Sequence, residues 1–317
     1  MSFAHTRWVW LNGRMVAWNE AKIHSSAHGL HYGTGVFEGT RCYATDRGPA
    51  IFRLDAHLDR LFASAEIYGM EIPFTREELR QATLDVVTRN GFGDSYLRHL
   101  CFLDTGSLGI RAACPVGVVI VAWPWQSVYS AMDIERGIRV TVSPWQKFSS
   151  AMMPTTAKAS GQYLNSRLAV TEAAKRGFDE AILLDVNGNV AEASVANVFL
   201  VRDGRLVTND ERSSILLGIT RATVIELARD SGYPVEIDRM RVGDLLTADE
   251  AFLTGTAAEI VPLRELDGMP IGMGSRGPVT ALLQASYQGV TSGQDARHEG
   301  WLEFAVNDER FDLATIA

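Results

Sequence analysis

The stretch Pro154-Thr155-Thr156-Ala157-Lys158-Ala159-Ser160-Gly161-Gln162-Tyr163-Leu164-Asn165-Ser166 sets one lysine among small, uncharged residues. These neighbours neither shield the ammonium group of Lys158 nor supply a carboxylate to pair with it. A lysine amine becomes a nucleophile toward carbonyl groups when its pKa is lowered, because the neutral form is then available. Lys158 is therefore a candidate Schiff-base lysine, although on this stretch alone an ordinary exposed lysine is the better interpretation.

The other lysines lie in less unusual surroundings, and only four of the 30 basic residues are lysine. Lys22 lies in a polar N-terminal stretch and is expected to be solvated. Lys147 lies in a Ser- and Gln-rich loop. Lys175 precedes Arg176 and Gly177 and is expected in the solvated last turn of a helix.

Bulk properties narrow the class of protein. A chain of 317 residues is long enough for two domains, each with its own core. A net charge of -8 disfavours binding to a phosphate backbone, so we expect no nucleic-acid partner. No apolar run approaches membrane-spanning length, and the start of the chain is no secretory signal, so we expect no membrane association and a cytoplasmic location. Three cysteines without a C-x-x-C spacing argue against a disulfide framework or a zinc ribbon.

The first half of the chain predicts strands, two helices and a glycine-rich segment. Asn12-Gly13 predicts a hairpin turn, and four glycines in 28–41 indicate close approach by another group or unusual backbone angles. His28 and His31 have an H-x-x-H spacing, but no Glu follows the first His and the glycines argue against a regular helix, so we expect no metal. Helices are expected at 56–68 and 75–88, the second with a capping box. The strands 96–103 and 116–125 follow.

A break in the strand pattern after 125 divides the chain. We expect a domain over 1–125, an interdomain loop over 126–137 and a second domain over 138–317. The second half predicts a helix at 161–176, a strand at 181–184, a helix opening at Gly218-Ile219-Thr220 and a last helix near 278–287. Thr220 taken alone is best explained as the helix N-cap.

Two stretches of the second half are candidate anion sites. The first amides of the helix at 218–220 are unpaired and favour a negative charge, and 255–258 ends a strand with small residues, although a tight turn explains it equally well. Together with a Schiff-base lysine, these sites describe a cofactor that carries an aldehyde and a phosphate. Pyridoxal 5'-phosphate is such a cofactor, and its pyridine nitrogen needs an acidic partner. Glu192 is a plausible partner, although a strand carboxylate more often faces solvent.

Seven stretches, spread in family order over nearly the whole chain, resemble the branched-chain-amino-acid aminotransferases of the fold type IV pyridoxal-phosphate class. They are HYGTGVFEGTRCY (31–43), HLDRL (57–61), YLR (96–98), PTTAKASGQYLNS (154–166), NGNVAEASVANVF (187–199), GITR (218–221) and GTAAEI (255–260). The resemblance implies a mixed α+β and α/β architecture of two domains. A smaller α/β N-terminal domain would precede a larger C-terminal domain with a β-barrel-like core, and the cofactor would lie at the domain interface.

The resemblance also implies roles for single residues. Lys158 would form the Schiff base and move the proton, Glu192 would hold the pyridine nitrogen, and Tyr163 would bond the phenolic oxygen. The phosphate would bind Arg60, Ile219, Thr220 and Thr256, although periodicity alone places Arg60 off the apolar stripe of its helix, as a solvated charge. The substrate residues would be Tyr32, Phe37, Tyr96, Arg98, Leu108, Ile110, Thr256, Ala257 and Ala258.

In this scheme Tyr96 and the amides of 256–258 meet the α-carboxylate, and Arg98 with Tyr32 meets the distal carboxylate of glutamate. The loop at 108–110 would come from the partner subunit of a homodimer, which could assemble further. His99 departs from the proline common at this position, and either Val128 or Tyr129 takes the place of a pocket tyrosine. The expected reaction moves the amino group of L-leucine, L-isoleucine or L-valine to 2-oxoglutarate in a ping-pong sequence.

Three other functions are considered. The same fold could serve a D-amino-acid or (R)-amine transaminase, or an aminodeoxychorismate-type lyase; the Y-x-R pair and G-T-A-A-E favour the branched-chain branch. A cofactor-free Schiff-base aldolase would need strands that alternate with helices, which the strands before residue 125 do not. A non-catalytic binding module would not need the lysine, two phosphate sites and a pyridine acid together.

Overall fold

The structure is a computed structural model, which describes residues 3, 5–125 and 127–305. The chain forms two compact units. Unit 1 comprises Met1–Gln126, Lys158–Gly161 and Gly289–Ala317, and unit 2 comprises Ser127–Ala157 and Gln162–Gln288. The expected limits of the two domains and of the interdomain loop stay a prediction, and residues 1–2, 4, 126 and 306–317 of these ranges lie outside the described residues.

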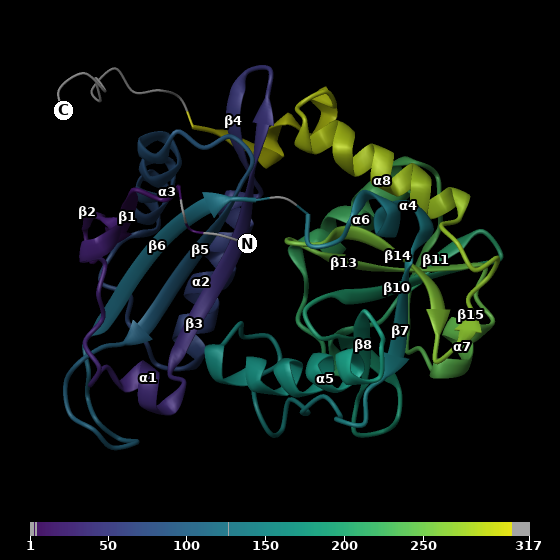
Figure 1. The fold of residues 1–317 in the computed structure, drawn as a ribbon, viewed down its shortest axis with the longest axis horizontal. Coiled ribbons are helices and arrows are strands. Elements are labelled where there is room, and N and C mark those ends of the chain that lie inside the picture. Colours follow the sequence, from purple (N-terminus) through teal and green to yellow (C-terminus); the bar gives the residue numbers. More distant parts are fainter. Residues whose placement is uncertain (1–2, 4, 126, 306–317) are drawn as a thin grey trace. The chain divides into compact units, whose positions relative to one another are not determined.

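Unit 1 is built on one seven-stranded sheet (Figure 1). In sheet order the strands are β16 (Leu302–Phe304), β4 (Gly48–Phe52), β3 (Gly35–Thr45), β5 (Ser95–Leu103), β6 (Val116–Pro124), β1 (Trp8–Leu11) and β2 (Arg14–Ala17). β1 and β2 form the expected hairpin, and both turn residues, Asn12 and Gly13, have positive φ. Since β4 pairs with β3 only at residues 42–45, the first part of β3 keeps a free edge on that side.

Two helices cover the core face of this sheet, α2 (Leu54–Ile67) and α3 (Arg76–Asn90). Thr75 and Glu78 form the expected capping box at the start of α3. The core contains fully buried Leu58, Leu79 and Leu97. Unit 1 also has α1 (His28–Tyr32) and the 3-10 helices η1 (Trp18–Glu20) and η4 (Ala296–Trp301).

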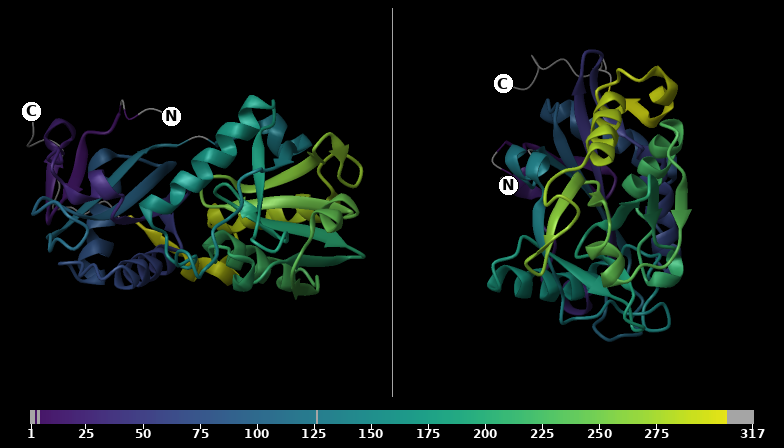
Figure 2. Two further views of the ribbon diagram at one scale, coloured as in Figure 1. Left: turned by 90° about the horizontal axis from the view of Figure 1, so that it is seen from below. Right: turned by 90° about the vertical axis from the view of Figure 1, so that its right-hand side faces the viewer.

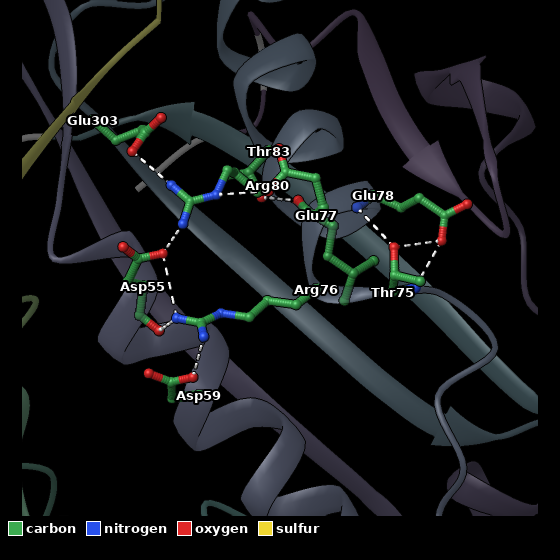
Figure 3. Close-up of polar contacts among 10 residues, drawn as sticks. Asp55, Asp59, Thr75, Arg76, Glu77, Glu78, Arg80, Thr83 and Glu303 are labelled. Atoms are coloured by element: carbon green, nitrogen blue, oxygen red, sulfur yellow. Dashed lines mark hydrogen bonds and ion pairs between the residues drawn. The ribbon is translucent and has the colours of Figure 1, made fainter.

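A group of ion pairs connects β16 with the helices α2 and α3 (Figure 3). Arg76 on α3 pairs with Asp55 and Asp59 on α2, at 3.3 and 2.7 Å. Arg80 pairs with Asp55 and, at 2.7 Å, with Glu303 on β16. The C-terminal strand is thereby anchored to a unit whose other strands come from the first half of the chain.

Unit 2 is built on a second sheet with helices outside it (Figure 2). Its strands in order are β12 (Val235–Ile237), β11 (Arg205–Thr208), β10 (Asn197–Arg202), β13 (Glu250–Gly255), β14 (Glu259–Leu266), β7 (Ile138–Val142), β8 (Glu180–Leu184) and β9 (Val190–Ala193), with β15 (Met269–Pro270) beside β14. Only residues 194–196 separate β9, at the end of this order, from β10, so the sheet curls strongly into a half-barrel. The mixture of helices with a curled sheet confirms the expected fold class.

Unit 2 has three long helices, α5 (Tyr163–Lys175), α6 (Ile219–Asp230) and α8 (Pro278–Thr291), although the last three residues of α8 belong to unit 1. It also has the short helices α4 (Ala131–Arg136) and α7 (Val242–Leu246) and the 3-10 helix η3 (Glu211–Ser213). The 3-10 helix η2 (Ser160–Gln162) begins in unit 1, and its last residue belongs to unit 2. Within the described ranges, none of the helices is long and apolar enough to cross a membrane.

Candidate active site

Lys158 lies on unit 1, along the free edge of β3. Its carbonyl accepts a hydrogen bond from the amide of Phe37 at 2.9 Å, and the next residue, Ala159, bridges to Val36. The amide of Lys158 donates to Ser64 Oγ on α2 at 3.0 Å. Its Nζ lies 5.2 Å from the centre of the Phe37 ring. A segment that follows unit 2 residues in sequence is therefore fixed to the sheet and helix of unit 1.

The surroundings of Lys158 favour its neutral amine. Burial lowers the pKa of Lys158 to about 8, the positive charge of Arg60 acts in the same direction, and Glu38 partly opposes both. A lysine with such a pKa is substantially neutral near pH 8, whereas an ordinary lysine is almost wholly protonated there. The shielding that the small residues of 154–166 do not provide comes from residues far away in the sequence.

Arg60 is fixed by a buried carboxylate. Glu38 on β3 accepts from Arg60 Nε at 2.6 Å and Nη2 at 3.0 Å, and from His57 Nδ1 at 2.7 Å. Burial alone would raise the pKa of Glu38, but Arg60 and His57 together hold it well below its usual range. Burial lowers the pKa of His57, so this imidazole is neutral and donates from Nδ1. The solvated surface charge that helical periodicity predicts for Arg60 is wrong, because only 14% of its side chain is exposed.

Tyr96 and Arg98 lie on one face of β5, as their alternate spacing predicts, and Phe37 on the neighbouring strand β3 lies on the same face of the sheet. The Arg98 guanidinium lies 4.5 Å from the Phe37 ring centre and 5.6 Å from that of Tyr96. Gly39 on β3 lies opposite Arg98. A Cβ added to Gly39 would lie 1.6 Å from the Tyr96 hydroxyl oxygen. Within the described residues, the buried Nε of Arg98 has no hydrogen-bond partner, so the guanidinium is able to receive a carboxylate.

Tyr32, Leu108 and Ile110 are exposed on this chain. The loop that carries Leu108 and Ile110 is held by His28, whose Nε2 lies 3.0 Å from the Gly109 carbonyl oxygen and whose Nδ1 lies 2.7 Å from Thr34 Oγ1. The glycine argument against a helix is wrong here, because His28 begins α1 and Tyr32 ends it. Among the described residues no group of three or more His, Cys, Asp or Glu could hold a metal ion.

Glu192, on β9 of unit 2, is buried rather than solvent-facing. Its Oε2 accepts from the amide of Leu216 at 3.0 Å and from Asn197 Nδ2 at 3.4 Å. Its Oε1 lies 2.6 Å from Nζ of Lys147. Lys147 is therefore not an ordinary loop lysine, and neither its spacing from Glu192 nor its Ser- and Gln-rich surroundings indicated this pair.

The N-terminus of α6 adjoins Asn197. Gly218 is the N-cap and has no side chain to occupy the first amides of the helix. A Cβ on Gly218 would lie 2.1 Å from Asn197 Oδ1, so only glycine fits against the residue that contacts Glu192. The interpretation of Thr220 as the N-cap is wrong: Ile219 begins the helix, and Thr220 follows as a buried residue. The first amides of α6 are thus available to an anion.

The remaining candidate residues of unit 2 lie at element ends. Thr256, Ala257 and Ala258 form the turn between β13 and β14, so the tight turn is confirmed, and all three are half-buried. Tyr163 is the half-buried first residue of α5. Of the two candidates for a pocket tyrosine, Val128 is exposed and Tyr129 packs against the core of unit 2.

Comparison with known proteins gives the family. Residues 35–266 match the model of amino-transferase class IV. The chain is 44% identical over 294 residues to the branched-chain-amino-acid aminotransferase of Pseudomonas aeruginosa, covering 92% of this chain and 95% of that one. It is 40% identical to the solved branched-chain amino acid aminotransferase of Escherichia coli, with a TM-score of 0.93 over 95% of this chain and 100% of that one.

Solved structures of this kind also contain ligands. The branched-chain amino acid aminotransferase of Thermobaculum terrenum, solved in its PLP-form, is 36% identical, with a TM-score of 0.89 over 95% of this chain and 99% of that one. Another solved branched-chain amino acid aminotransferase, 43% identical with a TM-score of 0.93, contains pyridoxamine 5'-phosphate. That enzyme has also been solved with N-(5'-phosphopyridoxyl)-L-glutamate and with 4-methylvaleric acid.

These matches extend over nearly the full length of both chains. The protein belongs to the class IV aminotransferases and, among them, to the branched-chain-amino-acid aminotransferases. The expected resemblance is confirmed.

Proposed function

We propose that this protein is a pyridoxal-phosphate-dependent aminotransferase that moves the amino group of L-leucine, L-isoleucine or L-valine to 2-oxoglutarate. The observation that carries this proposal is Lys158, a lysine with a lowered pKa beside the fixed guanidinium of Arg60. The relatives at 42–44% identity bear the same activity in their names.

The residues present fit pyridoxal phosphate. On unit 1, Lys158 supplies an amine for the aldehyde, and Arg60 supplies a guanidinium for the phosphate. On unit 2, Glu192 supplies a buried carboxylate for the pyridine nitrogen, and Tyr163 a hydroxyl for the phenolic oxygen. Ile219 and Thr220, at the helix start without a side-chain cap, and Thr256 would bind the phosphate.

When bound, the cofactor supplies an electron sink that makes the Cα–H bond of an amino acid acidic. Lys158 in its neutral form would accept this proton at Nζ, hold it there and release it again. The Glu38 carboxylate holds Arg60, whose positive charge lowers the pKa of Lys158, while the charge of Glu38 itself partly opposes this effect. One residue thus moves the proton while its neighbours set its protonation state.

The substrate groups are a carboxylate, an aliphatic side chain and, for glutamate, a second carboxylate. Tyr96 and the amides of 256–258 would meet the α-carboxylate. Arg98, with its buried unpartnered Nε, would meet the distal carboxylate together with Tyr32. Phe37, Leu108 and Ile110 would supply apolar walls. Such walls discriminate a single methylene by only about 1–3 kcal/mol, so all three aliphatic donors should react.

The exposed loop with Leu108 and Ile110 supports a homodimer in which this loop lines the partner's pocket. The composition supports a cytoplasmic location. Light scattering at micromolar concentration tests the dimer: the mass of a single chain would contradict it.

A donor panel tests the proposed reaction. Purified enzyme with pyridoxal phosphate and 2-oxoglutarate is given L-leucine, L-isoleucine, L-valine, D-alanine or (R)-1-phenylethylamine, and glutamate is measured. We expect glutamate from the three L-amino acids. Turnover confined to D-alanine or the (R)-amine would move the protein to another branch of the fold.

A further inference from the structure

Lys147 is a buried lysine that no expected role explains. About 8% of the residue is exposed, and its Nζ lies 2.6 Å from Glu192 Oε1. The lysine is held from three directions: its amide donates to the Leu184 carbonyl at 2.8 Å, its ammonium lies 4.5 Å from the Phe148 ring centre, and Glu192 accepts from it. An ammonium so placed is part of a built arrangement rather than a mobile surface charge.

The backbone explains how the lysine reaches this position. After β7 ends, the amides of Ser143 and Lys147 donate to the carbonyls of Ile182 and Leu184 on β8. The segment 143–147 therefore continues alongside β8, whose other neighbour is β9 with Glu192. Sheet order brings together two charges that lie far apart in the chain.

Glu192 depends on this cation. The carboxylate is buried, and its other described contacts are neutral donors, the Leu216 amide at 3.0 Å and Asn197 Nδ2 at 3.4 Å. A buried carboxylate without a counter-ion is strongly disfavoured, so loss of the lysine would leave Glu192 unpaired or displaced.

We propose that Lys147 is a positioning residue that balances the buried charge of Glu192 and orients its carboxylate toward the pyridine nitrogen of the cofactor. This inference rests on the proposed function for the identity of the ligand. The ion pair itself is formed by two side chains of unit 2. Both oxygens of Glu192 already accept hydrogen bonds, yet a carboxylate has about four acceptor sites, so an N–H from the cofactor can still be accommodated.

The first test uses the cofactor-free protein. Melting temperatures are measured for the wild type, Lys147→Met, Glu192→Gln and the double variant. We expect each single change to lower the melting temperature, and the double change to lower it by less than the sum, because it leaves no unpaired buried charge. Lys175→Met is the matched control, since its side chain is 70% exposed and its ammonium lies 3.9 Å from Glu172; its melting temperature should equal that of the wild type. Additive effects would overturn the pairing.

The second test asks whether the pair acts through the pyridine nitrogen. Dissociation constants are measured for pyridoxal phosphate and for its analogue with CH in place of the ring nitrogen. We expect Lys147→Met to raise the dissociation constant of pyridoxal phosphate about tenfold or more, as for loss of a hydrogen bond to a charged group. The CH analogue should bind the wild type and Lys147→Met equally, and Lys147→Arg should restore most of the affinity.

The outcomes separate the two proposals. If Lys147→Met lowers the affinity for both ligands equally, or for neither, the proposed role of Lys147 is overturned. If the wild type binds neither ligand, the proposed function fails, whereas the melting cycle on the cofactor-free protein still tests the ion pair.

Discussion

At the scale of the residue, the chemistry of Lys158 follows from its neighbours in space. Burial and the Arg60 charge lower its pKa to about 8. The neutral fraction of the amine should therefore rise as the pH passes through this value, and with it the reactivity of the cofactor-free protein toward an acylating reagent. Labelling of Lys158, followed by peptide mass spectrometry, should reach half its maximal rate near pH 8. A midpoint at about pH 10.4, the pKa of a free lysine side chain, would contradict this environment.

Glu38 is expected to act through Arg60. Glu38→Gln removes the charge that holds the guanidinium, which leaves a half-buried cation without its bidentate partner. We expect a loss of about 3–5 kcal/mol in stability and weaker binding of pyridoxal phosphate. Glu77→Gln is the control, because Glu77 is 79% exposed and lies 3.3 Å from Arg80. Equal urea midpoints for Glu38→Gln and the wild type would argue against this arrangement.

The sequence indicates which residues are chemically unusual but not how they pair. Lys158 and Glu192 could be selected from local pattern together with resemblance. The Glu38–His57–Arg60 group and the Lys147–Glu192 pair could not, because strand pairing and helix packing bring these side chains together. Arg60 illustrates the limit: its helical position indicates a surface charge, and only the carboxylate on β3 explains its burial.

At the scale of the element, signals carried by adjacent residues predict the structure well. The Asn12-Gly13 hairpin and the Thr75–Glu78 capping box are both present because a turn or a cap needs only a few neighbouring residues. The start of α6 was harder to predict. Thr220 is a good N-cap by residue type, but the close approach of Asn197 to Gly218 places the cap two residues earlier.

Gly39 tests the packing of β3 against β5. A Cβ there would lie 1.6 Å from the Tyr96 hydroxyl oxygen, and the Tyr96 ring packs 5.1 and 4.8 Å from Trp123 and Trp125. Gly39→Ala should displace Tyr96, destabilise the protein by about 1–3 kcal/mol and raise KM for L-leucine. The control is Gly289→Ala in α8, where a Cβ meets no atom within 4 Å; it should be neutral or stabilising by up to about 1 kcal/mol. If both variants behave alike, the contact is unimportant.

At the scale of the whole molecule, buried histidines link stability to pH. Burial lowers the pKa of His99 to about 3, and burial also lowers that of His57. The unfolded chain binds protons at these histidines below about pH 6.5, and the folded chain binds them less readily, so stability falls as pH falls through that range. Glu38 adds to the loss only at lower pH, where the unfolded carboxyl takes up a proton and the folded one remains ionised.

Urea unfolding between about pH 7.5 and 4.5, a range that brackets the pKa of an unfolded histidine, measures this dependence. The slope of the unfolding free energy against pH should be smaller by up to one proton in His99→Gln than in the wild type. The glutamine amide nitrogen takes the place of Nε2 as a donor to Thr83 Oγ1. Stability independent of pH over this range, or equal slopes, would contradict the neutral buried histidines.

The central claim, that Lys158 carries an amino-transfer reaction on pyridoxal phosphate, is tested most directly by visible absorbance. The purified protein is recorded before and after addition of L-leucine without an acceptor, alongside Lys158→Ala. We expect a yellow wild type whose band gives way on addition of L-leucine, and a folded Lys158→Ala variant with no turnover. A wild type that stays colourless after incubation with pyridoxal phosphate, or normal turnover by Lys158→Ala, would contradict the account.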